Sequence, residues 1–313
     1  MKKFSLLIVL FLLNACALDP KPTPSDGTTH RSSSSHEDVE IEPAKKFALV
    51  IGNSKYEHAK LRNPKRDAKD VSVVLGQIGF DVDKHLDLKD GEMKQAVDDF
   101  VKKLRANPQS VGLFYYAGHG ARANNGNNYL LPINNKNIDR EDQLAFKAID
   151  ARDVMTQMQD IGKAQVSILI LDACRNNPFR GTRSLNRGLN SMSSASGSII
   201  IFAADEGQTA ADGVGRNGLF TKHLLHMLKQ AYSNNIRIDD MFQNIRNGVV
   251  NETGGKQEPW YSASLSSPYC LRDNTQCGSG IIMQTSQSDD FFDDDPFEHI
   301  ERGDITPLPI PAP

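Results

Sequence analysis

The sequence has little net charge and few cysteines. The low charge argues against nucleic-acid binding, and the small number of cysteines argues against a metal site. The formal net charge is only −3, and no basic stripe with interleaved aromatic residues occurs, so nothing supports binding of nucleic acid. Of the four cysteines, Cys270 and Cys277 are close together, but no histidine or further cysteine lies near them at metal-ligand spacing. A hydrophobic content of 39% is still enough for one large globular domain.

The apolar run near the N-terminus is also short. Residues 4–13 are too few for a permanent membrane helix but suit a secretion signal. The run ends in Leu-Asn-Ala-Cys, which resembles the lipobox of bacterial lipoproteins. The resemblance implies a signal peptide over residues 1–15 and a lipid anchor on Cys16. The residue after the cysteine is Ala17, and this resembles the pattern in lipoproteins that are sorted to the outer membrane. We therefore expect a protein of the bacterial cell envelope, on the outer membrane and facing the periplasm. The alternative is an ordinary signal peptide with a chance cysteine.

Both ends of the chain lack the apolar residues of a folded domain. Residues 16–44 are rich in proline and serine, which predicts a flexible tether. Residues 271–313 are polar, then acidic, then proline-rich, which predicts a disordered tail. The aspartates of this tail match no calcium-binding loop in spacing, so a solvated acidic tail is the better interpretation. The globular domain is therefore expected over residues 45–270.

Within this domain, short apolar runs alternate with segments of helical spacing. The predicted strands are 47–51, 80–86, 111–116, 166–171, 198–203 and a short one near Trp260, and the predicted helices are 64–78, 90–105, 151–161, 218–231 and 238–250. This alternation predicts an α/β fold with a mostly parallel sheet of about six strands and helices on both faces. In such sheets the functional site lies at the carboxyl ends of the strands.

Two predicted strands run into reactive side chains, His119 and Cys174. A thiol attacks only as the thiolate, and a nearby imidazole accepts its proton and later protonates the leaving amine. Glycines flank His119, so the N–H of Gly120 and the N–H of Cys174 are candidates to bind an oxyanion. Taken singly, such a cysteine is more often a small buried residue and such a histidine a turn residue. Their pairing at two strand ends favours catalysis.

Two segments carry a family resemblance. Phe-Tyr-Tyr-Ala-Gly-His-Gly at 114–120 and Leu-Asp-Ala-Cys-Arg at 171–175 look like the signature segments of the caspase, metacaspase and paracaspase clan. Residues 51–67 are similar to the start of paracaspase domains, and residues 202–212 to a segment of metacaspases. The resemblance covers about residues 46–265. It implies a three-layer caspase-like fold and a cysteine endopeptidase.

The resemblance also implies the roles of single residues. His119 is the general base, Cys174 is the nucleophile, and no third member of a triad is identified. Animal caspases have glutamine two residues before the cysteine, whereas this chain has Asp172, an acid suited to a substrate arginine or lysine. Asp67 matches a second pocket acid of paracaspases, and Asp212 is a third candidate. Cleavage after basic residues is therefore expected, unless Asp172 is a loop cap or Asp67 only a helix N-terminal acid.

Several questions stay open at this point. The main alternative is a catalytically silent caspase-like module that binds a partner, and another is a hydrolase such as an amidase of cell-wall peptides. Metacaspases often need calcium and paracaspases do not, and this chain resembles both; no other cofactor or metal is expected. Residues 175–190 are either a self-cleavage site or a solvated basic loop. Cys270 and Cys277 form a disulfide in an oxidising compartment or are a spare pair, and the oligomeric state is unreadable.

Overall fold

A computed structural model describes residues 44–174, 189, 192, 195–205, 215–272 and 277. The lipidation candidate Cys16 and the pocket candidate Asp212 lie outside these residues. In chain order the elements are β1 (Lys46–Gly52), α1 (Pro64–Gln77), β2 (Asp81–Leu86), α2 (Asp90–Arg105), β3 (Val111–Arg122), β4 (Asn128–Leu130), the 3₁₀ turns η1 (Asn135–Asn137) and η2 (Glu141–Gln143), α3 (Leu144–Lys147), β5 (Ile149–Asp150), α4 (Ala151–Thr156), the π-turn η3 (Gln157–Ile161), β6 (Val166–Cys174), β7 (Ser198–Phe202), α5 (Leu219–Ser233), α6 (Ile238–Thr253) and β8 (Trp260–Ser264).

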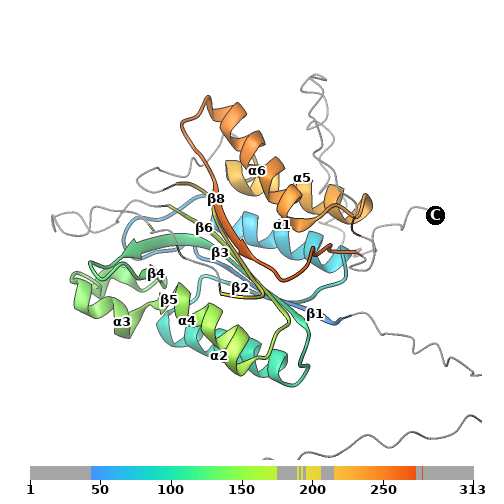
Figure 1. The fold of residues 1–313 in the computed structure, drawn as a ribbon. Helices are drawn as coiled ribbons and strands as arrows, with labels where there is room; N and C mark the ends of the chain where they lie inside the picture. Colours follow the sequence, from blue (N-terminus) through green and yellow to red (C-terminus); the bar gives the residue numbers. More distant parts are fainter. Residues whose placement is uncertain are drawn as a thin grey trace, which may run out of the picture. The chain divides into compact units, whose positions relative to one another are not determined.

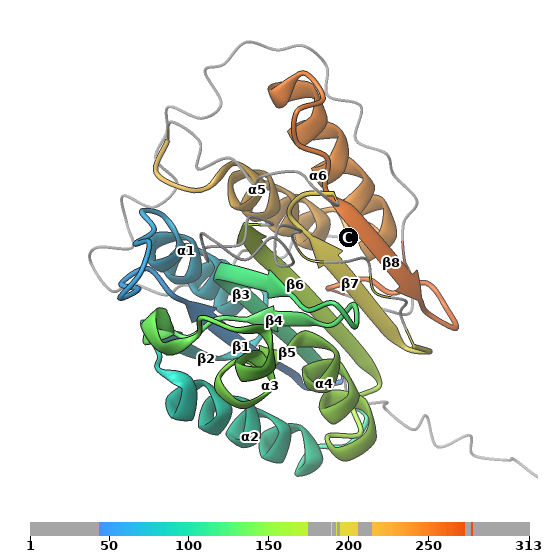
Figure 2. The same ribbon diagram turned by 90° about the vertical axis from the view of Figure 1, so that its left-hand side faces the viewer.

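One twisted sheet forms the centre of the fold (Figure 1). Its main strands follow the order β2-β1-β3-β6-β7-β8, and only β8 runs antiparallel to its neighbour. This agrees with the mostly parallel sheet predicted from the sequence. Two short strands were not predicted: β4 pairs with the end of β3, and β5 pairs with β4 (Figure 2).

The sheet is covered on both faces, which makes three layers. Successive residues of a strand point to opposite faces, so Tyr115 packs with α1, α5 and α6, whereas Tyr116 packs with α2 and α4. Figure 1 shows these two groups of helices on opposite sides of the sheet. The central strands are largely apolar because both of their faces are buried. Within the described residues, no helix combines the length and the hydropathy needed to cross a bilayer.

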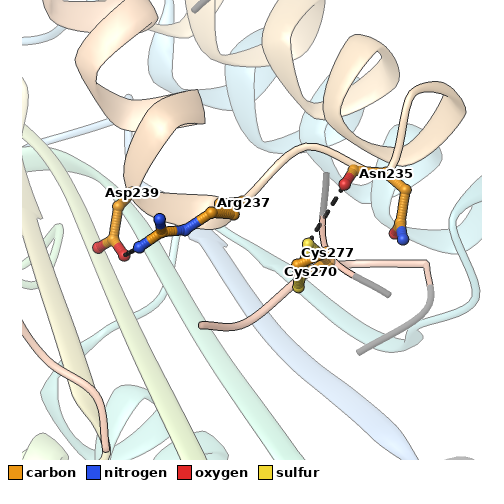
Figure 3. The surroundings of a disulfide bond; sticks show 5 residues. All are labelled: Asn235, Arg237, Asp239, Cys270 and Cys277. Carbon is orange, nitrogen blue, oxygen red and sulfur yellow. Dashed lines mark hydrogen bonds and ion pairs between the residues drawn. A yellow bond between two sulfur atoms is a disulfide. The ribbon is translucent and has the colours of Figure 1, made fainter. Parts of the chain in front are cut away.

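The C-terminal part of the described chain packs back on the helices. Cys270 forms an isolated bridge with Arg237, and the N–H of Ile238 donates to the carbonyl oxygen of Tyr269 at 2.9 Å. Cys270 and Cys277 form a disulfide, which answers the question that their spacing left open (Figure 3). The sulfur of Cys270 lies 3.3 Å from the carbonyl oxygen of Asn235.

A half-buried lysine ties this C-terminal segment to the first strand. The ammonium group of Lys46 donates to the carbonyl oxygens of Ile78 and Leu271, at 2.8 Å each. It also lies 5.5 Å from the centre of the Phe80 ring and 5.6 Å from that of Tyr232. Burial lowers the pKa of Lys46 to about 8. The beginning and the end of the domain are therefore joined at the edge where β1 starts.

Candidate active site

The structure brings the two predicted reactive residues side by side. β3 continues past the predicted end at residue 116, and its pairing with β6 runs on to the last pair, His119 opposite Cys174. The sequence was interpreted as a strand followed by a loop because Ala-Gly-His-Gly has little strand propensity. The partner strands override that propensity. The thiol group of Cys174 lies outside the described part of the structure.

His119 is 6% exposed and is oriented by the loop after β1. Its Nε2 lies 2.5 Å from the carbonyl oxygen of Ala59. A carbonyl oxygen only accepts, so Nε2 carries a proton in this contact, and Nδ1 is the basic nitrogen of the neutral ring. Sequence reasoning missed Ala59, because a backbone oxygen leaves no signal in the side-chain pattern. Its φ of 61° is one local mark of an unusual conformation.

Tyr56 holds His119 from a second side. The two rings lie 4.3 Å apart between centroids, and the backbone N–H of His119 donates to the Tyr56 hydroxyl at 2.7 Å. That hydroxyl is also 2.9 Å from the hydroxyl of Tyr116. A side chain on Gly118 would enter this space, since its first carbon would lie 2.4 Å from the Tyr56 hydroxyl and 2.6 Å from that of Tyr116. Glycine before His119 is thus needed for the tyrosines to approach.

The backbone N–H of Gly120 points away from β4. Gly120 lies opposite Leu130, and in the neighbouring pair the N–H of Leu131 donates to the carbonyl oxygen of His119 at 3.0 Å. Hydrogen-bonded and non-hydrogen-bonded pairs alternate along an antiparallel ladder, so Gly120 and Leu130 form a non-hydrogen-bonded pair. β4 lies on the β1 side of β3, where Asn53 donates to the carbonyl oxygen of Leu131 at 3.2 Å. The Gly120 N–H therefore points to the β6 side.

The predicted pocket acid Asp67 lies in the first turn of α1 and is 2% exposed. Its Oδ1 accepts hydrogen bonds from the side chain of Asn217 and from the N–H of Gly218, at 3.0 Å each. Burial, together with the carboxylate of Asp172, raises the pKa of Asp67 to about 8. Near neutral pH this carboxyl group keeps its proton unless a cation lies beside it.

The second predicted acid, Asp172, borders the same space as Asp67. A side chain on Gly218, at the start of α5, would place its first carbon 3.3 Å from Oδ2 of Asp67 and 3.7 Å from Oδ2 of Asp172. Glycine at this position leaves open the space between the two carboxyl groups. Paired carboxylates around such a space are suited to a guanidinium or an ammonium group.

A chain of hydroxyl groups orients Asp172. Thr221 on α5 donates to its Oδ2 at 2.6 Å, and Thr221 in turn lies 2.7 Å from the hydroxyl of Tyr115. Because the Thr221 hydroxyl donates its hydrogen bond to the carboxylate, its oxygen accepts the hydrogen bond from the Tyr115 hydroxyl. Burial, followed by the charges of Asp172 and Asp67, raises the pKa of Tyr115 well above its usual value. The tyrosine therefore stays protonated as the donor at the start of this chain.

Sequence reasoning missed a third acid, Asp70, one turn after Asp67 on α1. Asp70 is 1% exposed and accepts hydrogen bonds from Arg216 at 3.0 and 3.2 Å and from Asn217 at 2.8 Å. The three-residue spacing of the two aspartates puts them on one helix face, and this was the available signal. Arg216 balances the charge of Asp70. Among the described residues no group of three or more histidine, cysteine or acidic side chains is arranged to hold a metal ion.

The family is settled by comparison with known proteins: residues 45–269 match the caspase domain. The chain belongs to the caspase family. This confirms both the resemblance found in the signature segments and the three-layer α/β fold. Membership of this family indicates a cysteine peptidase.

The caspase domain also has relatives among known animal proteins. It is 30% identical over 237 residues to mucosa-associated lymphoid tissue lymphoma translocation protein 1 of Homo sapiens, which covers 74% of this chain and 27% of the human protein. It is 30% identical over 251 residues to the homolog from Mus musculus, covering 77% of this chain and 28% of the mouse protein. The chain thus aligns with little more than a quarter of either relative.

Proposed function

We propose that this protein is a cysteine endopeptidase that uses His119 and Cys174 to cleave peptides after arginine or lysine. The observation that carries the proposal is the pairing of His119 with Cys174 at the end of the β3–β6 ladder. Two acids, Asp67 and Asp172, border one space next to Gly218, and Asp172 pairs with Ala117 in the same ladder, two residues before the last pair. Position 174 follows Asp172 by two residues and therefore lies on the same face of β6.

The geometry supports a sequence of proton transfers. Ala59 fixes the proton of His119 on Nε2, so Nδ1 takes the proton of the Cys174 thiol. The thiolate attacks the carbonyl carbon of the substrate, and the oxyanion is bound by the N–H groups of Gly120 and Cys174. The imidazolium then protonates the leaving amine as the C–N bond breaks, which leaves a thioester. A water molecule that gives a proton to Nδ1 hydrolyses this thioester and restores the thiol.

The preference for basic residues follows from the pocket charges. A substrate guanidinium or ammonium group between Asp67 and Asp172 favours the ionised form of Asp67, which then gives up its proton. The Thr221 hydroxyl donates to Oδ2 of Asp172 and holds this acid beside the same space. An acidic substrate residue in the same space would face two carboxyl groups with no cation between them. Discrimination against aspartate is therefore part of the proposal.

The location follows from the N-terminal pattern. We propose that Cys16 is lipidated and that the protein is anchored to a membrane of the bacterial envelope, the outer membrane facing the periplasm. The Cys270–Cys277 disulfide supports an oxidising compartment. The partners are then a membrane, through the lipid, and a peptide or protein substrate with a basic residue at the cleavage position.

The decisive experiment is hydrolysis of fluorogenic peptides that end in arginine, lysine or aspartate, by the full-length protein, with and without calcium. Turnover of the arginine or lysine peptides that is lost in Cys174→Ala and in His119→Ala supports the proposal. Cleavage after aspartate alone would overturn the assignment of the pocket and leave the dyad intact. Absence of turnover under all conditions favours a silent binding module.

A further inference from the structure

The carbonyl oxygen that orients His119 belongs to a loop with little packing of its own. The side chains of residues 57–60 are all exposed. Tyr56 anchors the beginning of this segment through its buried ring. Hydrogen bonds to the backbone of residues 57–60 add further support.

Asn135 supplies two of those hydrogen bonds, both to the residue directly before Ala59. Its Oδ1 accepts from the N–H of His58 at 3.0 Å, and its Nδ2 donates to the carbonyl oxygen of His58 at 3.0 Å. A third bond runs nearby, from the N–H of Glu57 to the carbonyl oxygen of Ile133 at 2.8 Å. Asn135 is 1% exposed, so its amide group is shielded from water in the folded protein.

We propose that Asn135 is a positioning residue for the catalytic histidine. Its side-chain amide holds both sides of the His58 peptide backbone, as a neighbouring strand would. This fixes the carbonyl oxygen of Ala59 against Nε2 of His119. The inference rests on the proposed function, because it assigns Asn135 to the orientation of the base that activates Cys174.

The chemistry requires an amide at this position. An amide is a side-chain group that donates at one atom and accepts at the other, and this matches the N–H and C=O of one residue. In Asn135→Asp the acceptor remains, but a carboxylate oxygen replaces the donor and faces the carbonyl oxygen of His58. Asn135→Ala removes both bonds. Both variants release the Ala59 carbonyl from Nε2 of His119.

The neighbouring residue provides a matched control. Asn134 also makes two hydrogen bonds with a single residue, accepting from the N–H of Asp90 and donating to its Oδ1, at 3.1 Å each. Asp90 is the first residue of α2 and does not belong to the loop that carries Ala59. Asn134→Ala therefore removes the same kind of bonds from the same turn and leaves the contact between Ala59 and His119 in place.

The test is the rate at which iodoacetamide alkylates Cys174 in the full-length protein, followed by mass spectrometry of the peptide that contains this cysteine. The contact with Ala59 stabilises the imidazolium more than the neutral ring, because hydrogen bonds from charged donors are stronger. Loss of this contact lowers the fraction of protein molecules in which Cys174 is a thiolate and His119 is an imidazolium. Asn135→Asp and Asn135→Ala are expected to slow alkylation near pH 6.5 by about tenfold, and the alkaline limb of kcat/KM moves down by about one pH unit. Asn134→Ala keeps the wild-type profile.

The outcomes separate this inference from the proposed function. If Cys174 is alkylated at the wild-type rate in His119→Ala, the assignment of the dyad is wrong. If His119→Ala is slow but Asn135→Asp keeps the wild-type profile, only the role of Asn135 is overturned. A double variant decides between positioning and general disruption. Asn135→Asp is expected to have no further effect on alkylation in the His119→Ala background, and an equal effect in both backgrounds would refute the proposal.

Discussion

Burial of the Asp67 carboxyl group lowers the stability of the fold, and the variant Asp67→Asn is expected to reveal by how much. A carboxyl group whose pKa is raised to about 8 by folding binds more protons in the folded than in the unfolded state. The free energy of unfolding therefore falls as pH rises from about 4 to about 8, by about 1.4 kcal/mol for each pH unit. Asparagine fills the same volume and its oxygen still accepts from Asn217 and Gly218, but it does not ionise.

The variant is expected to be more stable than the parent protein, by an amount that depends on pH. Between pH 5 and pH 7 the difference in the free energy of unfolding grows by about 3 kcal/mol in favour of Asp67→Asn. Urea unfolding measures it, with the fluorescence of Trp260, the single tryptophan, as the probe. Both proteins carry Cys174→Ala so that self-cleavage does not interfere. Asp98→Asn, at an exposed position of α2, serves as the control.

The same substitution is expected to impair catalysis when Cys174 is present. Loss of one charged partner of the substrate guanidinium lowers kcat/KM for arginine peptides by about 10- to 100-fold. Higher stability with lower activity is typical of a residue that is kept for function. A stability difference that stays constant from pH 5 to pH 7 would refute the argument, because it would mean that folding does not perturb the ionisation of Asp67.

Two further substitutions test other parts of the site and fold. Gly118→Ala is expected to lower the free energy of unfolding by about 1 to 3 kcal/mol and kcat/KM by more than tenfold, because the methyl group displaces Tyr56 from His119. Wild-type urea unfolding and peptide hydrolysis in this variant would show that the contact is dispensable. Cys270→Ser opens the disulfide loop and is expected to cost about 2 to 3 kcal/mol. Reductant is expected to lower the Tm of the parent protein to that of the variant. A parent Tm that does not change when reductant is added would contradict this expectation.

The sequence was sufficient to predict the central sheet, because buried parallel strands are continuous apolar runs bounded by helical spacing. It also placed His119 and Cys174 just after the ends of two strands, and these strands prove to be neighbours. It could not predict that β3 extends through His119, since that extension depends on pairing with β6 and β4. The short strands β4 and β5 were missed for the same reason, as three and two residues carry too little pattern.

The support of the site was harder to predict than its reactive groups. Asp67 and Asp172 were predicted from a resemblance and lie beside one space, but their relation depends on Gly218, which is distant in sequence. Ala59 contributes a backbone oxygen, and Asn135 contributes an amide that bonds to backbone. Such contacts are set by the path of loops, and single-sequence patterns carry little information about that path.

The contacts of Lys46 mark one end of the sheet. Lys46 pairs with Val111 at the beginning of β3, and His119 follows Val111 by eight residues, about 26 Å along the strand. Residue 44, where the described part of the chain begins, therefore lies at the base of the sheet, whereas His119 and Cys174 lie at its opposite end. The end of the sheet at which the described chain begins is thus separated from the proposed site by the length of a strand.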